Sequence, residues 1–281
     1  MPIITFWSEK KKESAQTLSM IAIATHMAVE HNYKVLIIDT YLDSKVISDC
    51  YWDSKASNTV RKAVQQLNAG KMDLGAGLSG VAQLVKSGKE TPEAIKDYTK
   101  VIYKNRLEVL TGGKLSEQDR LEESFKDIIN VASRYYDYIF VDLRKGLDKP
   151  YIQEILDIST VIVVNLTQRL AALDEYRELV ENNKLFKSNK TLPLIGRYDR
   201  FSKYNKKNIS RNYLGMKEDV SVVPYNTLYF EATGEGGVAE YFLKFRKELM
   251  RSDDRNIEFV TDVATSTSDI INRVKALQMG F

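Results

Sequence analysis

Short, almost wholly apolar runs recur along this chain, and they constrain its fold more than any other feature. The first is Ile3-Ile4-Thr5-Phe6-Trp7 and the second is Val35-Leu36-Ile37-Ile38-Asp39. Between them, a polar stretch at residues 8–16 leads into an alanine-rich helical pattern from Thr17 to about His31. Strand, loop, helix and strand within forty residues predict a βαβ unit with parallel strands and a right-handed crossover.

The same rhythm continues along the chain. Further strands are predicted at residues 107–110, 138–142, 160–165, 192–196 and 220–224, with helices at 116–134 and 171–183. Because these strands are apolar throughout, both faces of the sheet must be covered, so we predict a mostly parallel, doubly wound α/β sheet. No repeat or long linker interrupts residues 1–281, so a single domain is expected, with C-terminal helices at about 238–281 packed on it or on a partner.

Composition excludes several classes of site. Cys50 is the only cysteine, so no intramolecular disulfide or zinc–thiolate cluster can form, and a reducing compartment is favoured. Only His26 and His31 are available, so a bound metal would be a hard ion such as Mg²⁺ held by oxygens. No apolar run is long enough to span a membrane, and the first residues lack the layout of a signal peptide, so we expect a cytoplasmic protein.

Polar residues gather where the predicted strands end. A loop at residues 8–17 follows the first strand, and Asp39 and Asp142 end two others. Ligands of such folds sit at the carboxyl ends of the strands. A loop followed by Thr17 at a helix start is the layout of a P-loop nucleotide site, where backbone N–H groups hold phosphates and the hydroxyl binds Mg²⁺. The pattern therefore predicts ATP and Mg²⁺ as candidate cofactors, with Thr17 and Asp142 at the metal.

In the order of these segments the chain resembles the ParA/MinD family of P-loop ATPases. The stretch Lys11-Lys12-Glu13-Ser14-Ala15-Gln16-Thr17-Leu18 corresponds to the family's deviant Walker A loop, Lys-Gly-Gly-x-Gly-Lys-Thr-Thr. Residues 34–39, 136–146 and 223–237 resemble later family segments. The resemblance implies a P-loop NTPase-like fold, a homodimer formed through the phosphate-loop face, and nucleotide contacts from Lys11, Ser14, Ala15, Gln16, Thr17 and Leu18. The TadZ/CpaE-like branch, which positions secretion or pilus machinery, has comparably irregular loops.

Several family positions are altered in this chain. Gln16 stands where the family lysine reaches the β- and γ-phosphates, and it carries no charge. The three loop glycines are replaced by Lys12, Glu13 and Ala15, whose Cβ atoms obstruct close backbone approach to phosphate. Tyr41 occupies the place of the second switch carboxylate, with Asp43 two residues further on, and Gly196-Arg197 replaces the adenine-binding asparagine. These changes predict absent or very weak ATP hydrolysis.

The net charge of +3 conceals one strongly basic segment. Residues 184–217 contain ten lysines and arginines against Asp199 alone. Such a segment is either a solvated face or the contact surface for an anionic partner, and non-specific DNA is the first such partner to test. The candidate contact residues are Lys203, Lys206, Lys207 and Arg211, in a loop predicted to enter a helix on which Lys207 and Arg211 share a face.

The C-terminal segment carries an amphipathic helical pattern. Thr267-Ser268-Asp269 is predicted to cap a helix whose apolar positions include Ile270, Val274 and Phe281. The pattern is weakly basic and only moderately apolar, so we expect packing on the body or on a partner rather than membrane contact.

Three functions fit the sequence. The first is a non-hydrolysing, dimeric positioning or assembly module that recruits a protein partner in DNA segregation or in polar or secretion machinery. The second is an active ParA-type ATPase in plasmid or chromosome partition. The third is a structural or filament subunit that retains only the fold. Function is borrowed from the fold in all three, so the site itself must decide.

Overall fold

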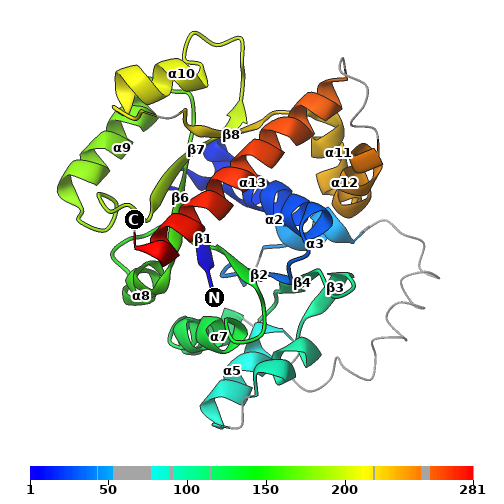
Figure 1. Ribbon diagram of the computed structural model, residues 1–281. Coiled ribbons are helices and arrows are strands. Elements are labelled where there is room, and N and C mark those ends of the chain that lie inside the picture. The colour runs from blue at the N-terminus through cyan, green and yellow to red at the C-terminus, as the bar shows by residue number, and fades with distance from the viewer. Residues whose placement is uncertain are drawn as a thin grey trace.

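A computed structural model describes residues 1–42, 44–52, 77–88, 91–113, 115–217, 219–247 and 254–280. A central sheet lies between two layers of helices (Figure 1). The eight strands are β1 Ile3–Trp7, β2 Val35–Asp39, β3 Lys100–Tyr103, β4 Leu107–Leu110, β5 Tyr138–Asp142, β6 Val161–Leu166, β7 Thr191–Tyr198 and β8 Ser221–Pro224.

The sheet order is β3-β4-β2-β5-β1-β6-β7-β8, and every neighbouring pair is parallel except β3 with β4. The predicted mostly parallel, doubly wound sheet is therefore confirmed. The antiparallel edge strand β3 was not foreseen, because its exposed, short sequence has no buried run to reveal it. In the register of β2 with β5, Asp39 lies directly beside Asp142, so the two predicted strand-end carboxylates are neighbours.

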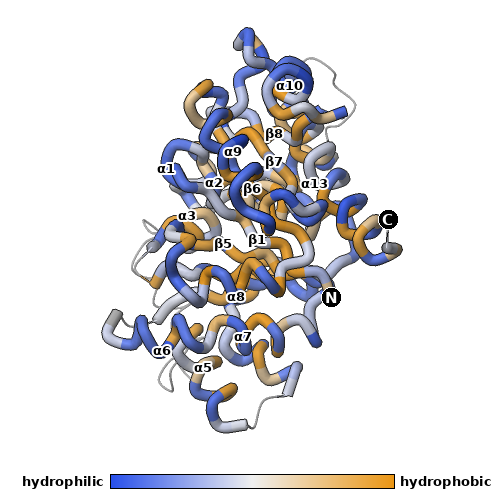
Figure 2. The backbone as a smooth tube through the Cα atoms, turned by 90° about the vertical axis from the view of Figure 1, so that its left-hand side faces the viewer, coloured by the Kyte–Doolittle hydropathy of each residue, from blue (hydrophilic) through white to orange (hydrophobic). Residues whose placement is uncertain are grey.

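Helices cover both faces of the sheet. One face packs against α2 Gln16–Glu30, α3 Val46–Tyr51, α11 Thr227–Glu235, α12 Val238–Lys247 and α13 Arg255–Met279. The other packs against α5 Leu78–Lys86, α6 Gln118–Glu122, α7 Phe125–Ala132, α8 Pro150–Ile158 and α9 Leu170–Asn182. Short elements complete the fold: α1 Lys11–Ser14, α10 Lys206–Asn208, the 3₁₀ turns Pro92–Asp97 and Leu115–Glu117, and the π-helical turn Ile209–Tyr213. In Figure 2 the central strands are mainly orange, whereas α1 and α10 are mainly blue.

The chain changes direction between β1 and β6. From β1 it passes through α2 to β2 on one side, and from β6 it passes through α9 to β7 on the other. Because both crossovers have the same hand, α2 and α9 lie on opposite faces of the sheet. The carboxyl ends of β1 and β6 thus form the topological switch point, where ligands of such sheets bind.

The C-terminal helix is longer than the sequence pattern predicted. Thr267, Ser268 and Asp269 do not cap it; they lie inside α13, which begins after Asp254, whose side chain accepts the Asn256 N–H. The prediction was wrong because the Thr267 and Ser268 hydroxyls donate to carbonyls four residues earlier, so they do not interrupt the helix. The helix packs along α2 and β8, with Val263, Ile270 and Val274 among its buried residues.

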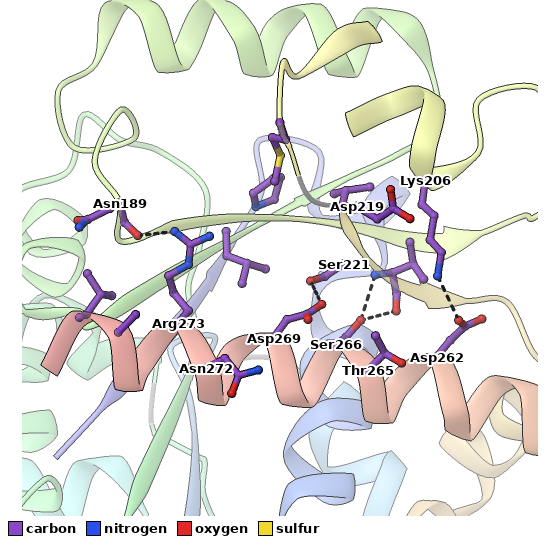
Figure 3. Close-up of a pocket in the computed structure, with 17 residues that line it drawn as sticks. Asn189, Lys206, Asp219, Ser221, Asp262, Thr265, Ser266, Asp269, Asn272 and Arg273 are labelled. Atoms are coloured by element: carbon purple, nitrogen blue, oxygen red, sulfur yellow. Dashed lines mark hydrogen bonds and ion pairs between the residues drawn. The ribbon is translucent and has the colours of Figure 1, made fainter. Parts of the chain in front are cut away.

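Helix α13 also covers the outer edge of the sheet. The Ser266 hydroxyl accepts the Val222 N–H at 3.0 Å and donates to the Val222 carbonyl at 2.7 Å (Figure 3). An uncovered edge strand offers such groups to other chains, so this contact closes part of β8 to pairing. The predicted single helix at 116–134 is divided into a 3₁₀ turn, α6 and α7, with a break at Ser124. Within the described part of the chain, no helix combines the length and apolarity that a membrane span requires.

Candidate nucleotide site

The segment after β1 is folded more tightly than the open loop predicted from its polar sequence. Lys11–Ser14 form one helical turn, and Ala15 joins it to α2 with a left-handed backbone at φ 51°. The Glu13 and Ser14 N–H groups both donate to the Lys10 carbonyl at 3.0 Å. These amides are bonded within the turn, so they do not form an open cradle for a phosphate.

Gln16 anchors the start of α2 to the sheet. Its side chain is 0% exposed, and its amide nitrogen lies 2.9 Å from the Phe6 carbonyl, 2.7 Å from Asp142 Oδ1 and 2.9 Å from the Leu143 carbonyl. All the donors of this amide are therefore directed into the protein. A lysine at this position would reach outward to a phosphate, whereas Gln16 links β1, β5 and α2.

Asp142 is the centre of the site. Besides Gln16 on Oδ1, its Oδ2 accepts the Thr17 hydroxyl at 2.7 Å and the Lys11 ammonium at 2.8 Å. Burial lowers the pKa of Lys11, while the charge of Asp142 opposes that shift. The Lys11 ammonium also lies 3.4 Å from the centre of the Tyr41 ring, a cation–π contact. Both oxygens of Asp142 are thus occupied by side chains of the same chain.

Asp39 is held beside Asp142 with one oxygen unpartnered. Its Oδ1 accepts the Tyr41 N–H at 2.9 Å, and its buried Oδ2 has no hydrogen-bond partner. Burial, and then the charge of Asp142, raises the pKa of Asp39 to about 8. Asp39 therefore carries a proton at neutral pH, which limits the charge repulsion between the two carboxyl groups.

These residues do not fit a bound Mg²⁺–nucleotide as they stand. Thr17 and Asp142 are the oxygen donors that a hard ion would use, but the Thr17 hydroxyl and the Lys11 ammonium are already on Asp142 Oδ2. Among the described residues, no group of three or more His, Cys, Asp or Glu side chains is placed to hold a metal ion. Asp43 lies outside the described residues.

Gly196, which sequence reasoning noted only as a replacement, shapes the site from β7. A Cβ at this position would lie 1.9 Å from the Ser14 carbonyl oxygen. Only glycine lets the end of the α1 turn approach the sheet so closely. The one sequence signal for this contact is the glycine at the end of an otherwise apolar strand, in Leu192–Gly196.

The comparison with solved structures identifies the fold. A ParA family ATPase from Chlorobium tepidum superposes with a TM-score of 0.67 over 94% of this chain and 98% of that one, at 16% identity. MinD from Pyrococcus horikoshii, solved with Mg-ADP, gives 0.63 over 97% and 98% at 15% identity. A putative plasmid partition protein from Borrelia burgdorferi, solved with AMPPNP, gives 0.59 over 95% and 98% at 16% identity. This chain has the ParA/MinD fold. No family model and no curated protein matches the sequence.

The ParA/MinD fold confirms the predicted resemblance at the level of architecture. The structure brings Lys11, Gln16 and Thr17 together on Asp142, at the place where the family pattern put the phosphate loop. Ser14 and Ala15 form the turn and its junction, and Leu18 packs partly buried against the core. The assignment of these residues to a nucleotide, and the TadZ/CpaE-like branch, stay predictions.

In this ParA/MinD fold the basic segment lies near α13. The Arg200 guanidinium pairs with Glu258 at 2.9 Å and with Asp262 at 3.4 Å, and the Lys206 ammonium lies 3.9 Å from Asp262. The helix predicted for Lys207 and Arg211 is α10 followed by a π-helical turn, so the α-helical spacing that placed them on one face does not apply. Lys203, Lys207 and Arg211 are exposed, whereas Lys206 is half-buried.

Exposed apolar side chains follow the carboxyl ends of several strands, a feature that sequence reasoning missed. Phe201, after β7, is 92% exposed, and the Tyr225 and Phe230 rings lie 6.1 Å apart beyond β8. The set that we call the apolar rim comprises Val46, Leu170, Phe201, Tyr225, Leu228 and Phe230. The only signal in the sequence was an aromatic residue within the basic, polar stretch at 200–203. Large exposed apolar side chains gathered at one edge are typical of an interaction surface.

Proposed function

We propose that this protein is a non-hydrolysing ParA/MinD-fold assembly module whose phosphate site is filled by its own side chains. The observation that carries the proposal is the occupation of Asp142 by Lys11, Gln16 and Thr17. In a working P-loop site these groups would serve the phosphates and the metal. Here they join α1, α2 and β5 into one unit, which keeps the loop closed without a nucleotide.

The chemistry of the site argues against hydrolysis. Phosphoryl transfer depends on positive charge and oriented N–H donors at the transferred group. Gln16 supplies no charge, and its amide nitrogen is committed to three acceptors inside the protein. Lys11 is the one loop cation at Asp142, and its ammonium is held there by the carboxylate and the Tyr41 ring. An active partition ATPase would require Lys11 to leave Asp142 and the turn to open.

The apolar rim supports assembly through the same face. It surrounds the carboxyl ends of the strands, where the phosphate loop also lies. We therefore infer a homodimer formed through this face, with a protein partner recruited by the dimer. Because the site is already filled, we expect the dimer to form without ATP. A filament subunit would instead associate without a defined end point.

Light scattering against protein concentration tests this function. Wild type should reach the mass of a dimer at the same concentration with and without ATP and Mg²⁺. Phe201→Ser should raise the dimer dissociation constant at least about tenfold, which corresponds to about 1.4 kcal/mol. Val101→Ser is the matched control, since Val101 is 56% exposed but lies on the edge strand β3. A monomer at all concentrations, or a mass that grows without limit, would exclude the dimeric module.

Titration calorimetry with ATP and Mg²⁺ tests the alternative of an ATP-dependent protein. If nucleotide binds at the loop, Lys11→Ala should weaken it by about tenfold or more, because a charge-assisted contact is lost. Binding that Lys11→Ala leaves unchanged would place the nucleotide elsewhere.

DNA is a second candidate partner, and the exposed cations Lys203, Lys207 and Arg211 favour it. Because Asp262 and Glu258 neutralise the neighbouring Arg200, the basic surface is smaller than the count of ten cations implies. Binding through this surface would be independent of sequence and would weaken steeply with salt.

A further inference from the structure

Two cavities stand out among the described residues, and they differ in how their polar groups are satisfied. The larger, of about 660 Å³, lies between α13 and the starts of β7 and β8 (Figure 3). Its polar groups pair with one another: Ser221 donates to Asp269, Ser266 bonds the Val222 backbone, and Arg273 donates to the Asn189 carbonyl. A cavity whose polar groups are already paired gives no sign of the ligand it would take.

The smaller cavity, of about 360 Å³, lies at the topological switch point. We call it the switch-point cavity; its lining includes Trp7 and Ser8 at the end of β1, Asn165 and Leu166 at the end of β6, and Ala172 and Tyr176 of α9. Its volume falls in the range of small-molecule sites, which begins at about 300 Å³. Position and size both favour a ligand site.

Polar atoms at this cavity lack partners. Asn165 is 1% exposed, and neither its Nδ2 nor its Oδ1 has a hydrogen-bond partner. The indole Nε1 of Trp7 is also buried and unpartnered. Buried polar groups are nearly always paired, so these atoms indicate a missing partner. A carboxamide offers a donor and an acceptor side by side, and it is best satisfied by a molecule with the reverse arrangement.

The walls and the mouth restrict the ligand further. The walls are apolar and include the rings of Trp7 and Tyr176, which suits a ring-bearing molecule. Glu9, Glu175, Glu178 and Lys10 also line the cavity, and the Lys10 ammonium is paired with Glu175 at 2.6 Å. The surplus of carboxylates disfavours an anion, so a phosphate or a carboxylic acid is a poor match.

We propose that the switch-point cavity binds an uncharged, ring-bearing molecule with a carboxamide-type edge, which pairs with the carboxamide of Asn165. The ring packs between the apolar walls, and the amide edge satisfies the two unpartnered atoms of Asn165. The site is separate from the proposed function, because it needs neither nucleotide nor dimer.

Three probes of nearly the same size test this chemistry: benzamide, benzoate and toluene. The chain has two tryptophans, so Trp52→Phe leaves Trp7 as the only indole and its fluorescence reports on the cavity. Benzamide should change the emission in a saturable way and bind at least about tenfold more tightly than benzoate or toluene, because each of those lacks one part of the match. No saturable change with benzamide, or equal binding of benzoate, would overturn the proposal.

Asn165→Leu in the same background separates a binding role from a structural one. It should abolish benzamide binding while leaving the melting temperature equal or higher, because it removes two buried atoms that have no partner. Asn130→Leu on α7, outside the cavity, is the matched control and should bind benzamide normally. Retained binding, or a lower melting temperature in Asn165→Leu, would overturn the proposal. If that variant does not fold, Ala172→Phe fills the cavity from α9, and binding that survives in it would do the same.

Discussion

Removing the Gln16 side chain should destabilise the protein by about 3–5 kcal/mol. The amide has three acceptors, of which Phe6 O also accepts the Leu143 N–H, and Asp142 also accepts Lys11 and Thr17. Gln16→Ala therefore costs about 1 kcal/mol at each of these two, and about 1–3 kcal/mol at the Leu143 carbonyl, which loses the amide in a buried position. The small cavity left behind adds to the loss.

Urea unfolding followed by circular dichroism measures this free energy. Gln153→Ala is the matched control, because the Gln153 amide makes one bond, to the Leu147 carbonyl at 2.6 Å, from a half-buried position. Its expected cost is about 1 kcal/mol or less. If Gln16→Ala unfolds within about 1 kcal/mol of wild type, Gln16 does not anchor the site, and the argument that its amide is committed to the fold is refuted.

Three further outcomes follow from the structure. Because the folded pKa of Asp39 is raised to about 8, the folded state binds more protons than the unfolded state between about pH 4 and pH 8, so stability should fall as pH rises through this range; Asp39→Asn should flatten that slope in urea unfolding measured at pH 5 and pH 8. Ser266→Ala should cost about 2–3 kcal/mol by leaving the Val222 N–H and carbonyl unpaired, whereas the exposed Ser268→Ala should stay within about 0.5 kcal/mol in the same assay. Changing four basic residues to Glu should weaken random-duplex binding at low salt at least about tenfold by fluorescence anisotropy, and equal curves would remove this surface from consideration; the four are Lys203, Lys206, Lys207 and Arg211.

The architecture could be predicted because the buried strands are apolar throughout. Runs such as Val35–Asp39 and Tyr138–Asp142 carry their signal locally, and the parallel order follows from the helices between them. The α13 start was missed for the opposite reason. Ser and Thr favour caps in short-range patterns, but here their hydroxyls bond back within the helix, which depends on the helix already being present.

The candidate site could be predicted in its members but not in its connections. The pattern brought Lys11, Thr17 and Asp142 to one edge, as the structure does. That Gln16 turns inward to the Phe6 and Leu143 carbonyls could not be foreseen, because those acceptors are backbone atoms with no sequence signature. The close approach of Gly196 to the Ser14 carbonyl and the exposure of Phe201 likewise depend on tertiary packing.

Steady-state phosphate release by the purified full chain, supplied with ATP and Mg²⁺, tests the central claim most directly. With Asp142 occupied by Lys11, Gln16 and Thr17, release should be indistinguishable from a blank without protein. Turnover above the blank that disappears in Thr17→Ala would show a working phosphate site and would contradict the account.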